Sequence, residues 1–305
     1  MRRVRYESAR GPLFVEEAPV PEARPGELLV RCEAVGVTLP VVRKVTEAAE
    51  PIPLGGEIAG EVVAVGGGVT RFRAGDRVTG LCFGHGYADF AVLHETMASP
   101  VPGHATAVDA VALVRSGLVA LGALAAAHPE YGESALVTGA ASGVGHLAVQ
   151  LARARGASRV LGAVSGSGKA EFVRSLGADE VVTYDAPDWG KPVDYALDAV
   201  GGALLTPALA AVAPGGRLVT YSSGGGTLQA YDLLVGAKTV TGFQMARIAR
   251  GQPELYERWR RELWQLFADG ALRPVVHAEF PLEEAAKAHA VIESRANRGK
   301  VVLRP

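Results

Sequence analysis

A glycine-rich segment between residues 135 and 153 constrains the fold of this 305-residue chain more than any other feature. An apolar stretch, Leu136 and Val137, runs into a turn that contains Gly139, Gly143 and Gly145. Apolar residues then recur at helical spacing, at Val144, Leu147, Ala148 and Leu151. A strand that enters a helix through glycines directs backbone N–H groups and the positive helix end at one spot. The segment therefore predicts a pyrophosphate-binding turn, with an ordinary tight strand-to-helix turn as the alternative.

Strand–helix alternation continues on both sides of this turn from residue 117 onward. Strands are expected at 135–139, 159–164, 180–184, 194–198, 217–221 and 239–243, with helices at about 143–155, 168–176 and 202–212. This alternation predicts an open parallel six-stranded sheet whose ligands bind at the C-terminal strand ends. A further helix is expected from Pro253 to about Ala268.

The first hundred residues have a different pattern, which is rich in short strands. Strands are expected at 28–37, 58–65, 77–81 and 87–94, separated by glycine-containing turns, and they predict a barrel-like or sandwich domain. The tail returns to this pattern with strands at 275–280 and 300–303 and a helix at 282–293. We therefore expect one domain made of residues 1–116 and 260–305, and a second made of residues 117–259.

Composition and charge exclude several classes of function. The formal net charge is −1 with mixed signs along the chain, which argues against nucleic-acid binding. The stretch 105–127 is interrupted by polar residues, and the first residues lack an apolar run, so neither a membrane span nor a signal peptide is expected. The two cysteines, Cys32 and Cys82, suit a reducing compartment. The expected location is cytoplasmic.

The end of the second predicted strand of the alternating region indicates which nucleotide the turn accepts. In an NAD site an acidic side chain at this place binds the ribose hydroxyls. Here the strand 159–164 is followed by Ser165-Gly-Ser-Gly-Lys169, which contains no carboxylate. Ser165, Ser167 and Lys169 offer hydroxyls and a cation that suit a 2′-phosphate, and Tyr184 after the third strand is a further candidate contact. We therefore expect NADPH as the cofactor, with a solvated polar loop as the alternative.

Over nearly its whole length the chain resembles the zinc-independent quinone oxidoreductase branch of the medium-chain dehydrogenase/reductase superfamily. Besides the glycine turn, the resemblance rests on Gly55-Gly-Glu-Ile-Ala-Gly-Glu, Ala74-Gly-Asp-Arg-Val, Gly86-Tyr-Ala-Asp-Phe, Lys169-Ala-Glu-Phe-Val-Arg-Ser-Leu-Gly-Ala-Asp, Pro214-Gly-Gly-Arg-Leu-Val and Gly299-Lys-Val-Val-Leu. It implies an α/β protein with a GroES-like β-rich domain, which binds the substrate and is completed by the tail, and a Rossmann domain with a doubly wound parallel sheet.

The resemblance also implies a set of site residues. Ala141, Ser142, Gly143 and Val144 would meet the pyrophosphate, and Gly139 belongs to the same cofactor-binding turn. Ser165, Lys169 and Tyr184 would meet the adenosine phosphate. The nicotinamide side would be lined by Tyr221, Ser222, Ser223 and Phe243, with Arg298 and Lys300 near the cofactor. A small-molecule substrate is implied, as is a homodimer that forms through the edge strand of the nucleotide sheet, at about residues 239–243.

The chain departs from the zinc-containing relatives at the metal ligands. Those relatives have a cysteine after the first long strand and a Gly-His-Glu motif, where this chain has Thr38 and Gly55-Gly56-Glu57. Tetrahedral zinc requires several Cys or His ligands, which Cys32 and Cys82 alone do not supply. We therefore expect no metal.

The chain also departs from the quinone branch on the substrate side. The usual Asn-x-x-Asp reads Thr38-Leu-Pro-Val41, and the tyrosine expected shortly afterwards is missing from residues 43–54. A Pro and a Thr that usually face the cleft are replaced by Val114 and Val119, with Arg115 between them. The substrate side of the site is therefore unusual for the branch.

Few polar side chains remain as candidate catalytic groups. Thr38 is a candidate hydrogen-bond donor to the substrate or the nicotinamide ribose, Tyr87 a candidate donor to an oxyanion, and Arg115 a candidate cation for an anionic or phenolic substrate. The alternatives are a strand-end hydroxyl bound by backbone for Thr38, a packing role for Tyr87 and a carboxylate-paired surface position for Arg115. We expect His85 in an exposed loop and His146 on a helix surface.

These features favour an NADPH-dependent, zinc-independent reductase of quinones or α,β-unsaturated carbonyl compounds. With no metal, the feasible chemistry is hydride delivery to a carbon conjugated to a carbonyl group. A second enzyme interpretation is a biosynthetic enoyl or enone reductase acting on a polyketide or thioester intermediate. An interpretation of another class is an NADPH-binding sensor or partner-binding protein without turnover, since fold alone does not fix function.

Overall fold

The computed structural model describes residues 1–82 and 84–305, and within them the chain forms two compact units. Unit 1 comprises Met1–Arg115 and Pro274–Pro305, and unit 2 comprises Ser116–Arg273. Residues 260–273, which the sequence analysis assigned to the β-rich domain, group with unit 2. The reason is local packing: the Leu263 side chain lies against Gly117, and Glu262 forms an ion pair with Arg155.

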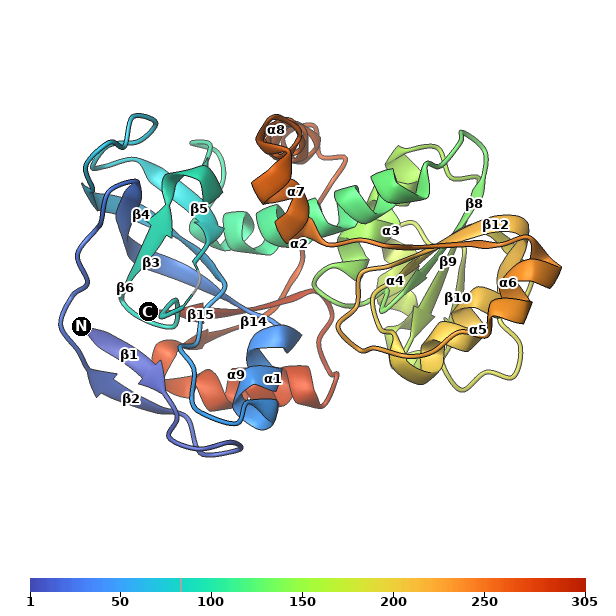
Figure 1. The fold of residues 1–305 in the computed structure, drawn as a ribbon, viewed down its shortest axis with the longest axis horizontal. Helices are drawn as coiled ribbons and strands as arrows, with labels where there is room; N and C mark the ends of the chain where they lie inside the picture. Colours follow the sequence, from blue (N-terminus) through green and yellow to red (C-terminus); the bar gives the residue numbers. More distant parts are fainter. Residues whose placement is uncertain (83) are drawn as a thin grey trace. The chain divides into compact units, whose positions relative to one another are not determined.

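Unit 2 contains a six-stranded sheet in which every pair of neighbouring strands is parallel (Figure 1). The spatial order is β10-β9-β8-β11-β12-β13, so the strand order reverses between β8 and β11. This is the doubly wound order of nucleotide-binding sheets, and it confirms the predicted open parallel sheet. The strands are β8 Ser134–Thr138, β9 Arg159–Val164, β10 Glu180–Thr183, β11 Val193–Asp198, β12 Val212–Thr220 and β13 Thr239–Gly242.

Helices alternate with these strands, as the sequence predicts for 143–155, 168–176, 202–212 and 253–268. They are α3 Gly145–Ala154, α4 Ala170–Ser175 after the 3-10 turn Ser167–Lys169, α5 Leu205–Ala210 after the 3-10 turn Gly202–Leu204, α6 Ala230–Gly236, α7 Met245–Gly251 and α8 Pro253–Ala268. Helix α2, Ala107–Ala127, begins in unit 1 and ends in unit 2. In the described part of the chain it alone has the length and hydropathy to cross a membrane, but 78% of its most apolar window is buried, as in a core helix.

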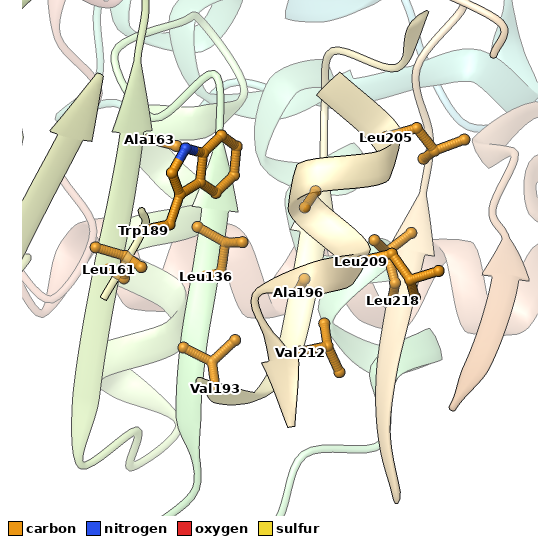
Figure 2. Packing of buried hydrophobic residues seen from close by; sticks show 11 residues of the cluster. Leu136, Leu161, Ala163, Trp189, Val193, Ala196, Leu205, Leu209, Val212 and Leu218 are labelled. Atoms are coloured by element: carbon orange, nitrogen blue, oxygen red, sulfur yellow. The ribbon is translucent and has the colours of Figure 1, made fainter. Parts of the chain in front are cut away.

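Aliphatic side chains fill one face of the unit 2 sheet, where α5 packs against it (Figure 2). Leu136 and Leu161 come from β8 and β9, and Leu205 and Leu209 come from α5. Trp189, in the segment between β10 and β11, covers the same cluster. Each buried Leu contributes about 1.5–3 kcal/mol relative to an exposed one, so this face holds the strand ends of the sheet in fixed positions.

Unit 1 contains a seven-stranded sheet and a separate two-stranded sheet formed by β1 and β2. The order in the larger sheet is β14-β15-β3-β4-β5-β7, and β6 also pairs with β3. The strands are β1 Arg2–Arg5, β2 Phe14–Glu17, β3 Glu27–Val37, β4 Glu57–Val65, β5 Arg77–Leu81, β6 Phe90–His94, β7 Ala98–Pro100 after the 3-10 turn Glu95–Met97, β14 Val276–Pro281 and β15 Lys300–Arg304. Strand β15 pairs antiparallel with β3, and Pro274–Pro305 group with unit 1.

Two helices belong entirely to unit 1. Helix α1, Leu39–Glu47, begins one residue after Val37, the last residue of β3. It has a proline in its first turn, a favourable place because a proline there loses no helical hydrogen bond. Helix α9, Ala285–Glu293, follows the 3-10 turn Leu282–Glu284 and packs against α1 and β15. The loop from β3 to α1 contains Thr38, so the fold of unit 1 places this residue at the end of a buried strand.

Candidate functional site

The turn after β8 presents three backbone N–H groups that have no hydrogen-bond partner within residues 1–82 and 84–305. They belong to Ala141, Gly143 and Val144. The neighbouring N–H groups all donate to other atoms of unit 2, among them Ala140 to the Ala163 carbonyl at 3.1 Å and Ser142 to the Gly139 carbonyl at 2.8 Å. Unpaired N–H groups beside the first turn of a helix attract anions. The turn therefore has the donors that a pyrophosphate requires.

Two glycines make the close approach in this turn possible. Gly139 has a φ of +62°, a conformation that L side chains rarely adopt. A Cβ added at Gly145 would lie 2.0 Å from the Gly139 carbonyl oxygen. The Ser142 hydroxyl accepts a hydrogen bond from the Gly145 N–H at 3.0 Å. Gly139, Ser142 and Gly145 thus shape the turn, while Ala141, Gly143 and Val144 leave their donors available.

The predicted adenosine-phosphate residues lie at the ends of β9 and β10, beside this turn. Ser165 is exposed and follows β9 directly, and Lys169 ends the 3-10 turn that comes next. The Tyr184 N–H donates to the Val164 carbonyl at 3.0 Å, and the Tyr184 hydroxyl accepts from the Gly139 N–H at 3.1 Å. Tyr184 therefore joins the end of β10 to the glycine turn after β8.

A buried carboxylate that the sequence analysis missed joins the ends of three strands. Asp198 is fully buried at the end of β11 and accepts hydrogen bonds from the Thr138 hydroxyl at 2.8 Å and the Thr220 hydroxyl at 3.1 Å. It also accepts from the Gly201 N–H. Buried carboxylates need such partners. The available signal was the presence of Thr138, Asp198 and Thr220 at the ends of three predicted strands.

The residues predicted for the nicotinamide side follow β12 and β13. The Tyr221 hydroxyl is buried and has no hydrogen-bond partner among the described residues; its burial and Asp198 raise its pKa. The Ser222 hydroxyl donates to the Val200 carbonyl at 2.6 Å, which closes the loop, whereas Ser223 is exposed. The Phe243 ring lies against Gly122 of α2. Of this set, Tyr221 is the residue with an unused buried polar group.

Two candidates from the sequence analysis occupy interior positions. Tyr87 is fully buried, its ring packs edge-on against His289 with centroids 5.7 Å apart, and its hydroxyl lies 3.2 Å from His289 Nε2. This position favours the packing role over oxyanion donation. The expectation of a surface position for His146 is wrong: the residue is fully buried, and its Nδ1 lies 2.9 Å from the Ser142 carbonyl oxygen. Its helix, α3, is covered on that side. His85 is exposed, as expected.

Two further candidates, Arg115 and Lys300, join a buried carboxylate in unit 1. Glu57 and Lys300 are each 2% exposed and form an ion pair between Glu57 Oε2 and Lys300 Nζ. Arg115 Nη1 donates to Glu57 Oε1 at 3.0 Å. We call these three residues the Glu57 cluster. Burial is the main cause that lowers the pKa of Lys300, although Glu57 opposes it. The structure thus places Lys300, predicted near the cofactor, in a buried ion pair.

Backbone packing makes room for this cluster. A Cβ added at Gly36 in β3 would lie 2.6 Å from Glu57 Oε2 and 2.9 Å from Lys300 Cε. Thr38, two residues further along, has extended backbone angles and its hydroxyl makes no capping hydrogen bond to α1. Since alternate residues of an extended chain face the same side, the Thr38 side chain lies on the same side as the cluster. Within the described ranges, no three His, Cys, Asp or Glu side chains form a group suited to a metal ion.

The fold and these sites define a two-domain dehydrogenase/reductase: a doubly wound sheet with an anion-binding turn after its central strand, and a β-rich domain completed by the C-terminal strand. Two family descriptions match the chain, "Alcohol dehydrogenase GroES-like domain" over residues 24–116 and "Zinc-binding dehydrogenase" over residues 176–303.

Individual relatives show which branch of this class the chain belongs to. A quinone oxidoreductase from Pseudomonas aeruginosa is 32% identical over 325 aligned positions, which cover 100% of this chain and 99% of the relative. The spectinabilin polyketide synthase system protein NorB from Streptomyces orinoci is 33% identical over 94% of this chain, which corresponds to 14% of that much longer protein. The chain belongs to the quinone oxidoreductase branch of the medium-chain dehydrogenase/reductase superfamily, and it is an oxidoreductase.

Solved structures agree with this assignment over the whole chain. A mycobacterial protein in complex with NADPH superimposes with a TM-score of 0.93 at 28% identity, covering 100% of both chains. The quinone oxidoreductase from Thermus thermophilus, solved together with its NADPH complex, superimposes with a TM-score of 0.85 at 30% identity and the same coverage.

Proposed function

We propose that this protein binds NADPH and, without zinc, transfers hydride to a quinone or an α,β-unsaturated carbonyl compound. The observation that carries the proposal is the set of three unpaired N–H groups at Ala141, Gly143 and Val144, next to a second strand that ends without a carboxylate. A cofactor with a pyrophosphate and a 2′-phosphate matches both features. The NADPH complexes of the two similar solved proteins support the same cofactor.

In this proposal the residues of unit 2 bind and orient the cofactor. The turn amides hold the pyrophosphate, with Gly139 and Ser142 maintaining the turn. Ser165 and Lys169 bind the 2′-phosphate, and Tyr184 supports them from the end of β10. The nicotinamide side is lined by Tyr221, Ser222, Ser223 and Phe243. Bound NADPH supplies a hydride from C4 of its nicotinamide ring.

In this reaction no side chain of the protein has to supply or remove a proton. Hydride adds to the carbon conjugated to the carbonyl, two electrons move to the carbonyl oxygen, and solvent supplies the proton that completes the reduction. The protein must hold the two reacting carbons close together and stabilise the developing oxyanion. In this scheme the Thr38 hydroxyl donates a hydrogen bond to the substrate. The buried position of Tyr87 leaves it a structural role.

A second candidate is favoured by the match to the polyketide synthase protein. There the substrate would be an enoyl thioester or another biosynthetic enone, reduced by the same hydride step. Activity on extended enones but not on simple quinones would support this candidate. Cofactor binding without turnover on either class would instead support the sensor or partner-binding interpretation.

Calorimetric titration with NADPH and NADH tests the cofactor half of the proposal. We expect tighter binding of NADPH, and we expect Lys169→Ala to weaken NADPH binding about 10-fold while affecting NADH little, because the lysine meets only the 2′-phosphate. Lys191→Ala, at an exposed lysine of the same unit, is the matched control. Failure to bind either nucleotide would rule out the reductase proposal.

We also propose a homodimer that forms through the β13 edge of the unit 2 sheet and a cytoplasmic location. Strand β13 lies at the end of the sheet order, and α6 exposes Tyr231, Leu234 and Val235 at 72%, 75% and 68%. Edge strands and exposed apolar patches are features that subunit interfaces use. Light scattering should report a dimer that Leu234→Glu converts to a monomer, whereas Val20→Glu, at an exposed apolar residue of unit 1, should not.

A further inference from the structure

The Glu57 cluster contains more positive than negative charge. Lys300 and Arg115 are two cations, and Glu57 is one carboxylate whose two oxygens are both used, Oε1 by Arg115 and Oε2 by Lys300. The charged groups that act on Lys300 are Glu57 and Arg115. Burial and Glu57 both raise the pKa of Tyr87, which therefore stays neutral. Since the buried pair of Glu57 and Lys300 is neutral, the surplus positive charge is that of Arg115, and it favours the binding of an anion.

Arg115 is the member of the cluster that an incoming molecule can reach. Its side chain is 27% exposed, whereas the side chains of Glu57 and Lys300 are 2% exposed. Among the described residues, Glu57 is the one hydrogen-bond partner of the Arg115 guanidinium, which donates through Nη1. A guanidinium has five N–H donors in a planar fork, so one edge remains available. That edge has the geometry that binds a carboxylate with two parallel hydrogen bonds.

The cluster also fixes the direction of this edge. Glu57 is held by Lys300 in the space that Gly36 leaves open, and it anchors one end of the guanidinium. An arginine held in this way loses less conformational entropy when it binds a ligand than a free surface arginine does. Thr38 follows Gly36 by two residues and its hydroxyl makes no capping hydrogen bond to α1, so it is a candidate neutral donor to the same ligand.

We propose that the available edge of Arg115 binds a carboxylate carried by the substrate, so that the quinone or enone reduced by this protein is an acid. This inference rests on the proposed function and names the substrate class for it. The carboxylate brings the charge of the Glu57 cluster to zero, which a neutral quinone does not do. Arg115 is therefore a residue that determines substrate specificity rather than one that takes part in hydride transfer.

The test compares an acidic enone with its neutral ester. With NADPH, the protein is assayed on (E)-4-oxo-4-phenylbut-2-enoate and on its methyl ester, and the ratio of the two kcat/KM values is measured. We expect Arg115→Leu to lower the acid-to-ester ratio about 10- to 100-fold, the range for loss of a charge-assisted hydrogen bond. Arg115→Lys should give an intermediate ratio because it keeps the charge but not the fork. The difference in intrinsic reactivity of acid and ester cancels between variants.

Controls separate this role from a structural one. Arg115→Leu leaves Glu57 paired with Lys300, so the variant keeps a neutral buried pair and should fold. Arg31→Leu removes the exposed ion pair with Glu61 in the same unit and should leave the acid-to-ester ratio as it is in the wild type. The dissociation constant of NADPH should be the same in wild type and Arg115→Leu. A ratio that does not change in Arg115→Leu would overturn the proposal, and weakened NADPH binding would assign Arg115 to the cofactor instead.

The outcome also distinguishes this proposal from the proposed function. If neither enone is reduced although NADPH binds, the reductase proposal fails for this substrate class. The anion site is then tested alone, by calorimetry of the cofactor-loaded protein with the unreactive acid 4-oxo-4-phenylbutanoate. Binding that is lost in Arg115→Leu would support the carboxylate site, and no binding in the wild type would overturn it.

Discussion

The two units build their candidate binding groups from different parts of the polypeptide. In unit 2 the donors are backbone N–H groups within a single turn, residues 139–145. In unit 1 the charges come from β4, α2 and β15, and Glu57 is separated along the chain by 58 residues from Arg115 and by 243 from Lys300. A backbone site depends on local conformation, whereas the Glu57 cluster exists only once the sheet of unit 1 has assembled. The two sites should therefore respond differently to substitution.

The largest effect should come from removing the carboxylate of the Glu57 cluster. In Glu57→Gln, Lys300 remains buried without a counter-charge, and Arg115 loses its partner. We expect a loss of about 3–5 kcal/mol in the free energy of unfolding, measured in urea. The control Glu61→Gln breaks the exposed pair with Arg31 and should cost under about 1 kcal/mol. Similar losses in both variants would contradict a buried cluster and remove the contrast between the units.

In unit 2 the corresponding substitution is Gly145→Ala, which acts on backbone geometry alone. The new Cβ would lie 2.0 Å from the Gly139 carbonyl oxygen, so the turn must move and its N–H groups must change direction. We expect NADPH binding to weaken by about 3 kcal/mol, or about 100-fold, in calorimetry. Gly251→Ala, at a glycine of the same unit with open space around it, should bind NADPH like the wild type. Normal binding by Gly145→Ala would show that the turn does not hold the cofactor.

The free energy of unfolding should depend on pH through His289, which is buried against Tyr87 in unit 1. Burial lowers the pKa of His289 to about 4, below the value of about 6.5 expected in the unfolded chain. The neutral ring is therefore favoured in the folded state: its stabilisation is full above pH 6.5 and is lost as the pH falls toward 4. At pH 5 the loss is about 2 kcal/mol.

The variant His289→Gln isolates this contribution. The decrease in unfolding free energy between pH 7 and pH 5 should be about 2 kcal/mol smaller in His289→Gln than in the wild type, since the substitution removes the titrating ring. His104→Gln, at an exposed histidine of unit 1, provides the control. An identical decrease in wild type and His289→Gln would argue that the ring is protonated inside the protein.

The smallest effect should come from Tyr184→Phe, which removes the acceptor of the Gly139 N–H but leaves the turn in place. Loss of one neutral hydrogen bond costs about 1 kcal/mol, so NADPH binding should weaken about 5-fold. Titration of the variant with NADPH and with NADH distinguishes two roles of Tyr184, support of the glycine turn and direct contact with the 2′-phosphate. Equal losses for NADPH and NADH indicate support of the turn, and a larger loss for NADPH indicates direct contact with the 2′-phosphate.

The contrast between the units also explains what could be predicted from the sequence. The six strands of unit 2, the glycine turn and the return of the tail followed from hydrophobic periodicity and glycine position, which are local properties. Helix α1 was missed because Thr38 alone separates β3 from Leu39, and no glycine marks the change from strand to helix. The Asp198 network was missed because its members are 60 residues apart or, for Thr220, 22 apart, and only the parallel sheet aligns their strand ends.

Side-chain roles in unit 1 were harder to predict than those in unit 2, although one prediction in unit 2, the surface position of His146, was also wrong. His146 has the sequence surroundings of a surface helix residue, yet its side chain is fully buried. In unit 1, Lys300 was expected near the cofactor from its place in the terminal motif, but its pairing with Glu57 depends on strands β15 and β4, which both lie next to β3. Long-range ion pairs of this kind have no signature in a single sequence.

The pairing of β15 with β3 has a consequence for how the chain folds during synthesis. All strands of unit 2 are made in one continuous stretch, so this unit has its complete sheet while translation is still in progress. Unit 1 begins first, but the last partner of β3, strand β15, is available only when residues 300–304 emerge. Until then β6 and β4 already pair with β3, but Val35–Val37 lack their partner strand and Glu57 lacks Lys300. The unit that begins first is therefore the last to complete its sheet, and for that interval the Val35–Val37 part of β3 is an open edge at which nascent chains can aggregate.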